Sequence, residues 1–146
     1  MRPVKYFIAV VSKDHAMRGV NDSFMQVCHG KEAPLKRMQP GDWLIVYSSK
    51  LKMEEDLKCQ CFTAIGRVEE AEVYQVEVTA TFKPFRKKIK FFNCKETSIL
   101  PLINVLECIP DKQHWGYPFR FGFLEINEND FNTISSKLLI NEKSER

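Results

Sequence analysis

The order in which strand-like and helix-like segments follow one another most constrains what this chain can fold into. About six segments have the apolar, β-branched or alternating pattern of strands; these are 6–11, 24–28, 43–48, 61–68 continued by 74–78, 85–93 and 121–126. Short helices are expected at 13–20, 33–38, part of 97–109 and 128–139. Strands and helices do not alternate regularly, which argues against a doubly wound parallel sheet. We therefore expect an α+β fold, a mixed sheet curving into a small β-barrel with short helices packed outside.

Local patterns add two expectations about side chains. Because side chains alternate along a strand, Phe62 and Ala64 should lie on the same face of the strand at 61–68. Asn127, with Asp130 three residues later, has the pattern of a helix N-cap. The last helix is therefore expected to begin directly after Asn127.

The length and charge of the chain limit its class. The 146 residues suit one domain with a single core, 1–146, in which the polar segment 141–146 is expected to be a frayed tail. The net charge of +3, from 22 Lys and Arg against 19 Asp and Glu, is a weak bias. A protein of this charge that binds nucleic acid needs its positive charge gathered in one place.

The five cysteines are expected to be free thiols in a cytoplasmic protein. Their odd number and irregular spacing do not form a disulfide framework. The first residues run straight into the strand-like segment 6–11, which is too short for a signal peptide core or a membrane span. We therefore expect no membrane association, while the sequence does not indicate an oligomeric state.

Metal binding, cofactors and catalysis are not expected. Cys59-Gln60-Cys61 is one residue tighter than the usual pair of zinc-binding cysteines. Cys28 and His29 are adjacent, and on a strand their side chains would point to opposite faces, so they do not form a nucleophile and base. No glycine-rich phosphate loop is present, because the six glycines are scattered.

The segment 79–95 is basic and aromatic, and it contains no acidic residue. Basic side chains contact phosphates and aromatic rings stack on bases, so this segment is a candidate for the phosphate backbone. The candidate phosphate-binding residues are Lys83, Arg86, Lys87, Lys88 and Lys90. The alternative is an edge strand whose lysines prevent aggregation.

A second aromatic segment, 115–120, places three rings and a guanidinium within six residues. Trp115 or Tyr117 is expected to form the wall of a pocket, and Arg120 to pair with a phosphate or a buried carboxylate. Tyr47 and Ser48 end the clearest strand and would present hydroxyl groups near the mouth of a barrel.

Four segments together resemble the EVE domain (UPF0310-type family) of the PUA-like superfamily. They are 6–15, 19–30, 34–48 and 115–131, and they include Pro40-Gly41-Asp42-Trp43 and Trp115-Gly116-Tyr117-Pro118. The resemblance implies a PUA-like mixed barrel, related to PUA and ASCH domains and to the YTH readers of methylated adenine. In YTH domains a pocket beside the first helix holds the modified base between aromatic walls. The matching places here are Ser12 and Phe24, although YTH domains carry Trp where this chain has Phe24.

The leading hypothesis is a nucleic-acid-binding module that takes a modified or flipped base of DNA or RNA into an aromatic pocket. The pocket would lie between the first helix and the second and third strands, with these candidate residues: Ser12, Phe24, Gln26, Tyr47, Ser48, Trp115, Tyr117 and Arg120. Gln26 is expected on the same face as Phe24, and its amide can both donate to and accept from a base edge. The alternatives are a PUA-like RNA-binding domain without such a pocket, and a small ASCH-type nucleoside hydrolase.

Overall fold

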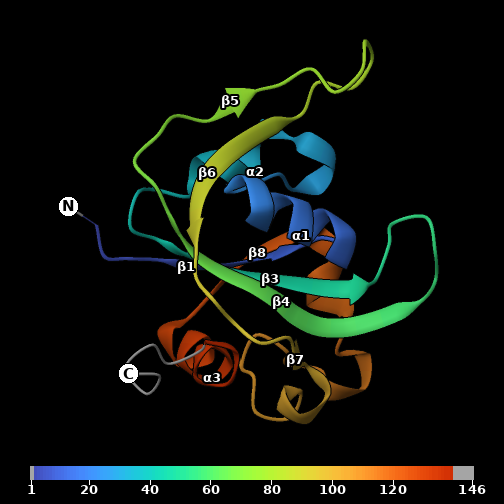
Figure 1. The fold of residues 1–146 in the computed structure, drawn as a ribbon. Coiled ribbons are helices and arrows are strands. Elements are labelled where there is room, and N and C mark those ends of the chain that lie inside the picture. Colours follow the sequence, from blue (N-terminus) through green and yellow to red (C-terminus); the bar gives the residue numbers. More distant parts are fainter. Residues whose placement is uncertain (1, 140–146) are drawn as a thin grey trace.

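The computed structural model describes residues 2–139, and the expected frayed tail at 141–146 lies outside this range. The first half of the chain forms β1 (Tyr6–Val10), α1 (Lys13–Asp22), β2 (Phe24–Met25), α2 (Glu32–Arg37), β3 (Trp43–Lys50) and β4 (Lys58–Val68). The second half forms β5 (Tyr74–Gln75), β6 (Phe85–Phe91), β7 (Thr97–Ser98), β8 (Phe123–Ile126) and α3 (Glu128–Leu138). Figure 1 shows the strands as one curled sheet between helices.

The sheet is mixed, as the sequence predicts. Its main path has the order β2-β6-β4-β3-β1-β8, with β5 paired to β6 and β7 paired to β4. β1 and β3 run parallel, and the other pairs are antiparallel. The expected curved sheet of about six strands with helices outside it is therefore confirmed.

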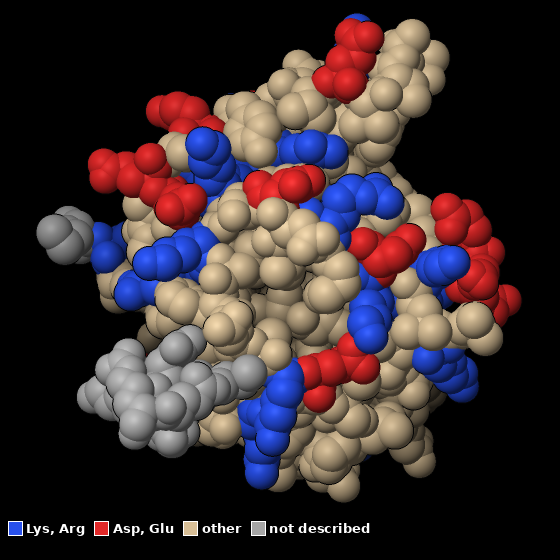
Figure 2. Space-filling model, viewed as in Figure 1, with Lys and Arg blue, Asp and Glu red and all other residues tan. Residues whose placement is uncertain are grey.

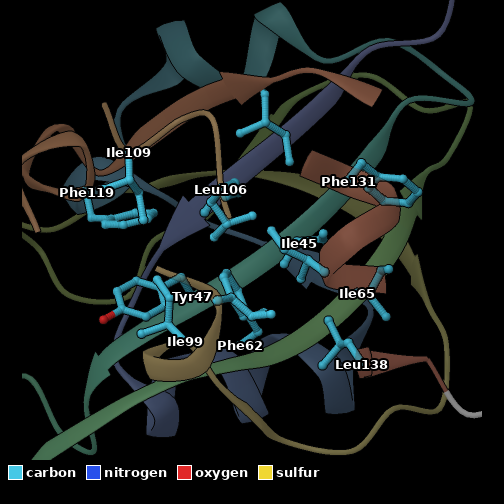
Figure 3. Close-up of a cluster of buried hydrophobic side chains, with 14 residues drawn as sticks. Ile45, Tyr47, Phe62, Ile65, Ile99, Leu106, Ile109, Phe119, Phe131 and Leu138 are labelled. Carbon is cyan, nitrogen blue, oxygen red and sulfur yellow. The ribbon is translucent and has the colours of Figure 1, made fainter. Parts of the chain in front are cut away.

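Both faces of the central strands are buried, which explains why β1 and the first five residues of β3 are apolar. Phe7 and Ala9 pack with the first two helices, in a cluster that also contains Ala16 and Leu35. Ile8 on the other face belongs to a second cluster. Figure 3 shows part of this cluster, in which Ile45 and Ile65 of the sheet lie with Phe131 and Leu138 of α3 and with Leu106. In Figure 1, α1 and α2 accordingly lie on one side of β3 and β4, and α3 lies on the other.

A β-bulge at Thr63 overturns the expected alternation along β4. Val46 pairs with Ala64 and Tyr47 pairs with Phe62, so Thr63 has no partner in the ladder. The extra residue turns Phe62 and Ala64 to opposite faces, and they belong to different hydrophobic clusters. At the bulge, the Thr63 hydroxyl forms a buried hydrogen bond of 2.8 Å with the Ser48 hydroxyl.

The predicted strand at 24–28 is also shorter than expected. After β2 the chain enters a tight turn in which Cys28 and His29 have φ angles of 48° and 60°. Gly30 makes this turn possible, because its φ is 87° and an added Cβ would lie 2.4 Å from Cβ of Pro84. Cys28 and His29 thus belong to a turn rather than a strand, and the expectation of side chains on opposite faces does not apply.

The two helix starts differ. Asn127 caps α3 as predicted, because its side chain accepts a hydrogen bond of 2.8 Å from the Asp130 N–H. Ser12 lies at the N-cap of α1, but its hydroxyl donates to Asp14 Oδ1 at 2.6 Å instead of capping the helix. No helix among residues 2–139 is both long and apolar enough to cross a bilayer.

Candidate functional site

A cavity of about 500 Å³ opens beside α1. Its walls come from the end of β1, one face of α1, β2 with the turn that follows, the end of β3, the 78–86 hairpin and residues 119–122. These segments are far apart in the sequence, and the curl of the sheet brings them together. The volume is within the range of about 300–1,000 Å³ that is usual for small-ligand sites.

The polar lining of the cavity is basic. Its charged residues are Arg18, Lys50, Arg86 and Arg120, joined by His15 and His29, and no Asp or Glu among residues 2–139 lines it. The nearby Asp14 carboxylate is held by the Ser12 hydroxyl and the His15 N–H, at 2.6 and 2.9 Å. Burial opposes its ionisation, but these hydrogen bonds outweigh burial and lower the pKa of Asp14. The cavity therefore favours an anionic ligand or one rich in hydrogen-bond acceptors.

One part of the cavity wall consists of three side chains in mutual contact, Phe24, Gln26 and Arg86. The Arg86 guanidinium lies 4.0 Å from the centre of the Phe24 ring, and its Nε donates to Gln26 Oε1 at 3.0 Å. Phe24 is only 6% exposed. The guanidinium therefore covers the ring, and a ligand that reaches this wall meets a planar cation backed by an aromatic ring.

The aromatic residue of the 115–120 segment that lines the cavity is Phe119, which was not among the candidate residues. Its ring packs against Tyr47, with ring centres 4.7 Å apart. Tyr47 is 1% exposed and lies behind Phe119, in the core shown in Figure 3, where burial raises the pKa of its phenol strongly. The 115–120 segment thus contributes the Phe119 ring to the lining, where Trp115 or Tyr117 was expected.

Of the other candidate base-pocket residues, some line the cavity and some do not. Ser12, Phe24, Gln26 and Arg120 line the cavity. Ser48 is fully buried against Thr63, and Trp115 packs against the core, so neither lines the cavity. Tyr117 is 57% exposed and lies outside the lining, 5.9 Å from the Arg120 guanidinium.

Of the candidate phosphate-binding residues on and before β6, one lines the cavity and the others do not. Arg86 lines the cavity, whereas Lys87 is buried and donates its Nζ hydrogen to the Ala71 carbonyl. Lys88 and Lys90 are exposed away from the lining, and exposed Lys83 lies 3.9 Å from Glu77. β6 pairs with β2 on one side and with β4 and β5 on the other, so the alternative of a guarded edge strand is wrong.

Several lining residues were missed from the sequence. His15 and Arg18 are three apart on α1, and this helical spacing is the signal that could have placed them on one face. Met53, Val78 and Phe82 form an apolar rim that is exposed to solvent. They come from loops whose positions depend on the whole fold, and local pattern gave no signal for them beyond the aromatic character of 82–92.

The cavity has one thiol and two imidazoles among its described lining residues, from Cys28, His15 and His29. Cys28 lines it, but burial raises the pKa of this thiol, and its Sγ donates a long hydrogen bond of 3.6 Å to the Phe121 carbonyl. No carboxylate of residues 2–139 lines the cavity. The lining can offer a ligand stacking, hydrogen bonds and positive charge.

Two solved structures share the fold. The NMR structure of Rpa0253 from Rhodopseudomonas palustris superimposes with a TM-score of 0.58 at 15% identity, and 92% of each chain is covered. The crystal structure of the MmI1 YTH domain superimposes with a TM-score of 0.55 at 9% identity, covering 90% of this chain and 92% of that one. The expected α+β, PUA-like fold is confirmed, and it is the fold that the chain shares with this YTH domain.

Sequence relatives are much more similar. A UPF0310 protein encoded in the gntR 5′ region of Bacillus licheniformis is 50% identical over 128 residues, which are 88% of this chain and 87% of the relative. A UPF0310 protein of Mycolicibacterium vanbaalenii is 45% identical, covering 91% of this chain and 92% of the relative. The family model named EVE domain matches residues 5–137. The chain therefore belongs to the EVE domain family.

Proposed function

We propose that this protein is a nucleic-acid-binding module that takes a flipped or unpaired base into the cavity beside α1. The observation that carries the proposal is the composition of the lining. In the described part of the chain it has four Lys or Arg side chains, no carboxylate, and a guanidinium already stacked on a ring. Nucleic-acid ligands combine flat π-faces with anionic phosphates, and this lining complements both. The fold shared with a YTH domain supports the same class of ligand.

The base would stack on the outer face of the Arg86 guanidinium, with Phe119 and the apolar rim around it. Gln26 uses its Oε1 to hold Arg86, so its NH₂ group remains to donate to an acceptor on the base edge. Stacking of one base contributes about 1–3 kcal/mol. An additional methyl group that becomes buried adds about 0.8 kcal/mol, which is less than a tenfold preference. Selective reading of a methylated base therefore needs the apolar rim to close around the methyl group.

The phosphates next to the bound base would be held by the remaining cations. Arg18, Lys50 and Arg120 come from three separate segments of the chain, and all three line the cavity. Lys83 and Lys88 are exposed and can contact more distant phosphates of the same strand. Their contribution would be independent of sequence and sensitive to salt.

The distribution of charge favours this model over general RNA binding without a pocket. On the face shown in Figure 2, Lys and Arg alternate with Asp and Glu, so this face presents no broad basic surface. The cavity lining gathers four Lys or Arg side chains, and no Asp or Glu of residues 2–139 is part of it. Recognition by a pocket thus has more support than recognition by a basic face.

A binding screen tests the proposal directly. Fluorescence anisotropy would compare single-stranded and duplex DNA and RNA, each unmodified and with methylated bases. Arg86→Gln and Arg120→Gln remove cavity charges, whereas the matched control Lys90→Gln removes one exposed charge from β6. We expect each cavity variant to lose about tenfold or more in affinity and the control to lose little. Equal losses in all three variants would show that the protein binds through surface charge, without the pocket.

A further inference from the structure

A second group of side chains with shared chemistry lies outside the lining of the cavity. Cys59 and Cys61 belong to the first part of β4, and Glu96 immediately precedes β7. The two Sγ atoms and a Glu96 carboxylate oxygen all lie within 4.8 Å of one another. No disulfide joins the two cysteines, and both are partly exposed.

The backbone fixes the two parts of this cluster against each other. Cys61 pairs with Ser98 in the β4–β7 ladder, and the Ile99 N–H donates to the Gln60 carbonyl at 3.0 Å. Gln60 has a φ of 54°, at a second irregularity in the β3–β4 pairing. Glu96 is thus brought to the cysteines by the sheet, although it is thirty-five residues further along the chain than Cys61.

We propose that Cys59, Cys61 and Glu96 form a binding site for one thiophilic divalent cation, for which Zn²⁺ is the best match. Two thiolates and one carboxylate are a donor set that suits zinc and leaves a fourth position for water. Zinc bond lengths of about 2.0–2.3 Å place tetrahedral ligand atoms roughly 3.3–3.8 Å apart. The three side chains would have to close by about 1 Å, a shift that partly exposed side chains make by small rotations.

The close spacing of the two cysteines is compatible with this site. The usual zinc-binding pair is separated by two residues because it lies on a turn. Here the pair flanks the irregularity at Gln60 in β4, and both sulfur atoms lie near the same carboxylate. The sequence predicts no metal site from the spacing of Cys59 and Cys61. That prediction does not consider Glu96, which the fold brings next to both cysteines.

The cluster already holds a cation. The Lys13 ammonium forms a salt bridge of 2.7 Å with Glu96, at the start of α1. A metal ion would have to displace this ammonium from the carboxylate, so Lys13 competes with the metal. Removal of Lys13 should therefore strengthen metal binding, whereas loss of a side chain that merely supports the local structure would weaken it.

Cobalt and zinc titrations of the reduced protein test this site. Co²⁺ reports thiolate ligands through a charge-transfer absorption band, and Zn²⁺ affinity is measured by competition with a chromophoric chelator. We expect a one-to-one complex with the cobalt–thiolate band. Cys59→Ser, Cys61→Ser and Glu96→Gln should each weaken binding about tenfold or more, since even loss of an outer-shell partner costs 10–100-fold. Lys13→Met should bind the metal more tightly than the parent.

The matched controls are the other cysteines, Cys28→Ser, Cys94→Ser and Cys108→Ser, which should leave the affinity unchanged. Circular dichroism would establish that each variant is folded before titration. Absence of the cobalt–thiolate band, a band that survives in the Cys59→Ser/Cys61→Ser double variant, or a Lys13→Met affinity no higher than that of the parent would overturn the proposal. None of these measurements involves nucleic acid, so they are independent of the proposed function.

Discussion

At the residue scale, Arg86 is the side chain that can distinguish binding by stacking from binding by positive charge alone. Its guanidinium covers the Phe24 ring at 4.0 Å, and the Nε–H bond to Gln26 fixes the plane of the group. Lysine has the same charge but neither the flat π-surface nor an Nε–H donor. Replacement by lysine therefore removes the proposed stacking and keeps the electrostatic attraction.

We predict that Arg86→Lys lowers the affinity for the preferred oligonucleotide about tenfold, which corresponds to stacking of one base at about 1–3 kcal/mol. The slope of log affinity against log salt concentration should stay unchanged, because the number of neutralised phosphates is the same. Anisotropy titrations at several salt concentrations measure both quantities. A variant that binds as tightly as the parent would show that Arg86 acts only through its charge.

At the scale of elements, the cavity depends on how closely α1 approaches β2. A Cβ atom added to Gly19 would lie 2.5 Å from the Phe24 carbonyl oxygen, so a side chain here must push the helix away from the strand. Gly19 also lines the cavity beside His15 and Arg18. In contrast, a Cβ atom added to Gly116 would meet no atom within 4 Å. The two glycines form a matched pair for testing the contact between helix and strand.

Gly19→Ala is predicted to destabilise the protein by about 1–3 kcal/mol, as expected when an extra methyl group is forced into a packed contact. It should also weaken oligonucleotide binding, because Phe24 and Arg18 would move apart. Gly116→Ala should change the free energy of unfolding by less than about 0.5 kcal/mol. Urea denaturation followed by circular dichroism compares the two variants, and equal stability would disprove a tight contact between α1 and β2.

The elements also show how far the sequence predicts the fold and where prediction fails. The last helix is predicted with its cap, because both signals are local to Asn127 and Asp130. The bulge at Thr63 is not predicted, since it depends on how β4 pairs with β3. The same limit applies to the cavity: residues such as Met53 and Phe82 reach it from separate loops. Only the folded sheet brings these segments together.

At the scale of the whole molecule, two hydrophobic clusters on opposite faces of one sheet set the stability, and thiols lie at their margins. Cys94 and Cys108 pack against one cluster, and Cys28 packs against the other. Burial raises the pKa of all three thiols. For Cys108, burial and the neighbouring Asp130 carboxylate raise the pKa to about 12. An unfolded thiol has a pKa of about 8.5, so the native state keeps protons that the unfolded state releases.

The free energy of unfolding is therefore predicted to fall as the pH rises above about 8.5. In this range the unfolded state binds fewer protons than the native state, so the slope of stability against pH is negative. Each thiol with a strongly raised pKa contributes up to about 1.4 kcal/mol per pH unit. Cys108→Ala should make the slope shallower, whatever its effect on stability at neutral pH, because it removes the thiol with a pKa of about 12. Urea denaturation between pH 7 and 10 measures the slope, and the same slope in the variant and the parent would show that Cys108 has an ordinary pKa in the folded protein.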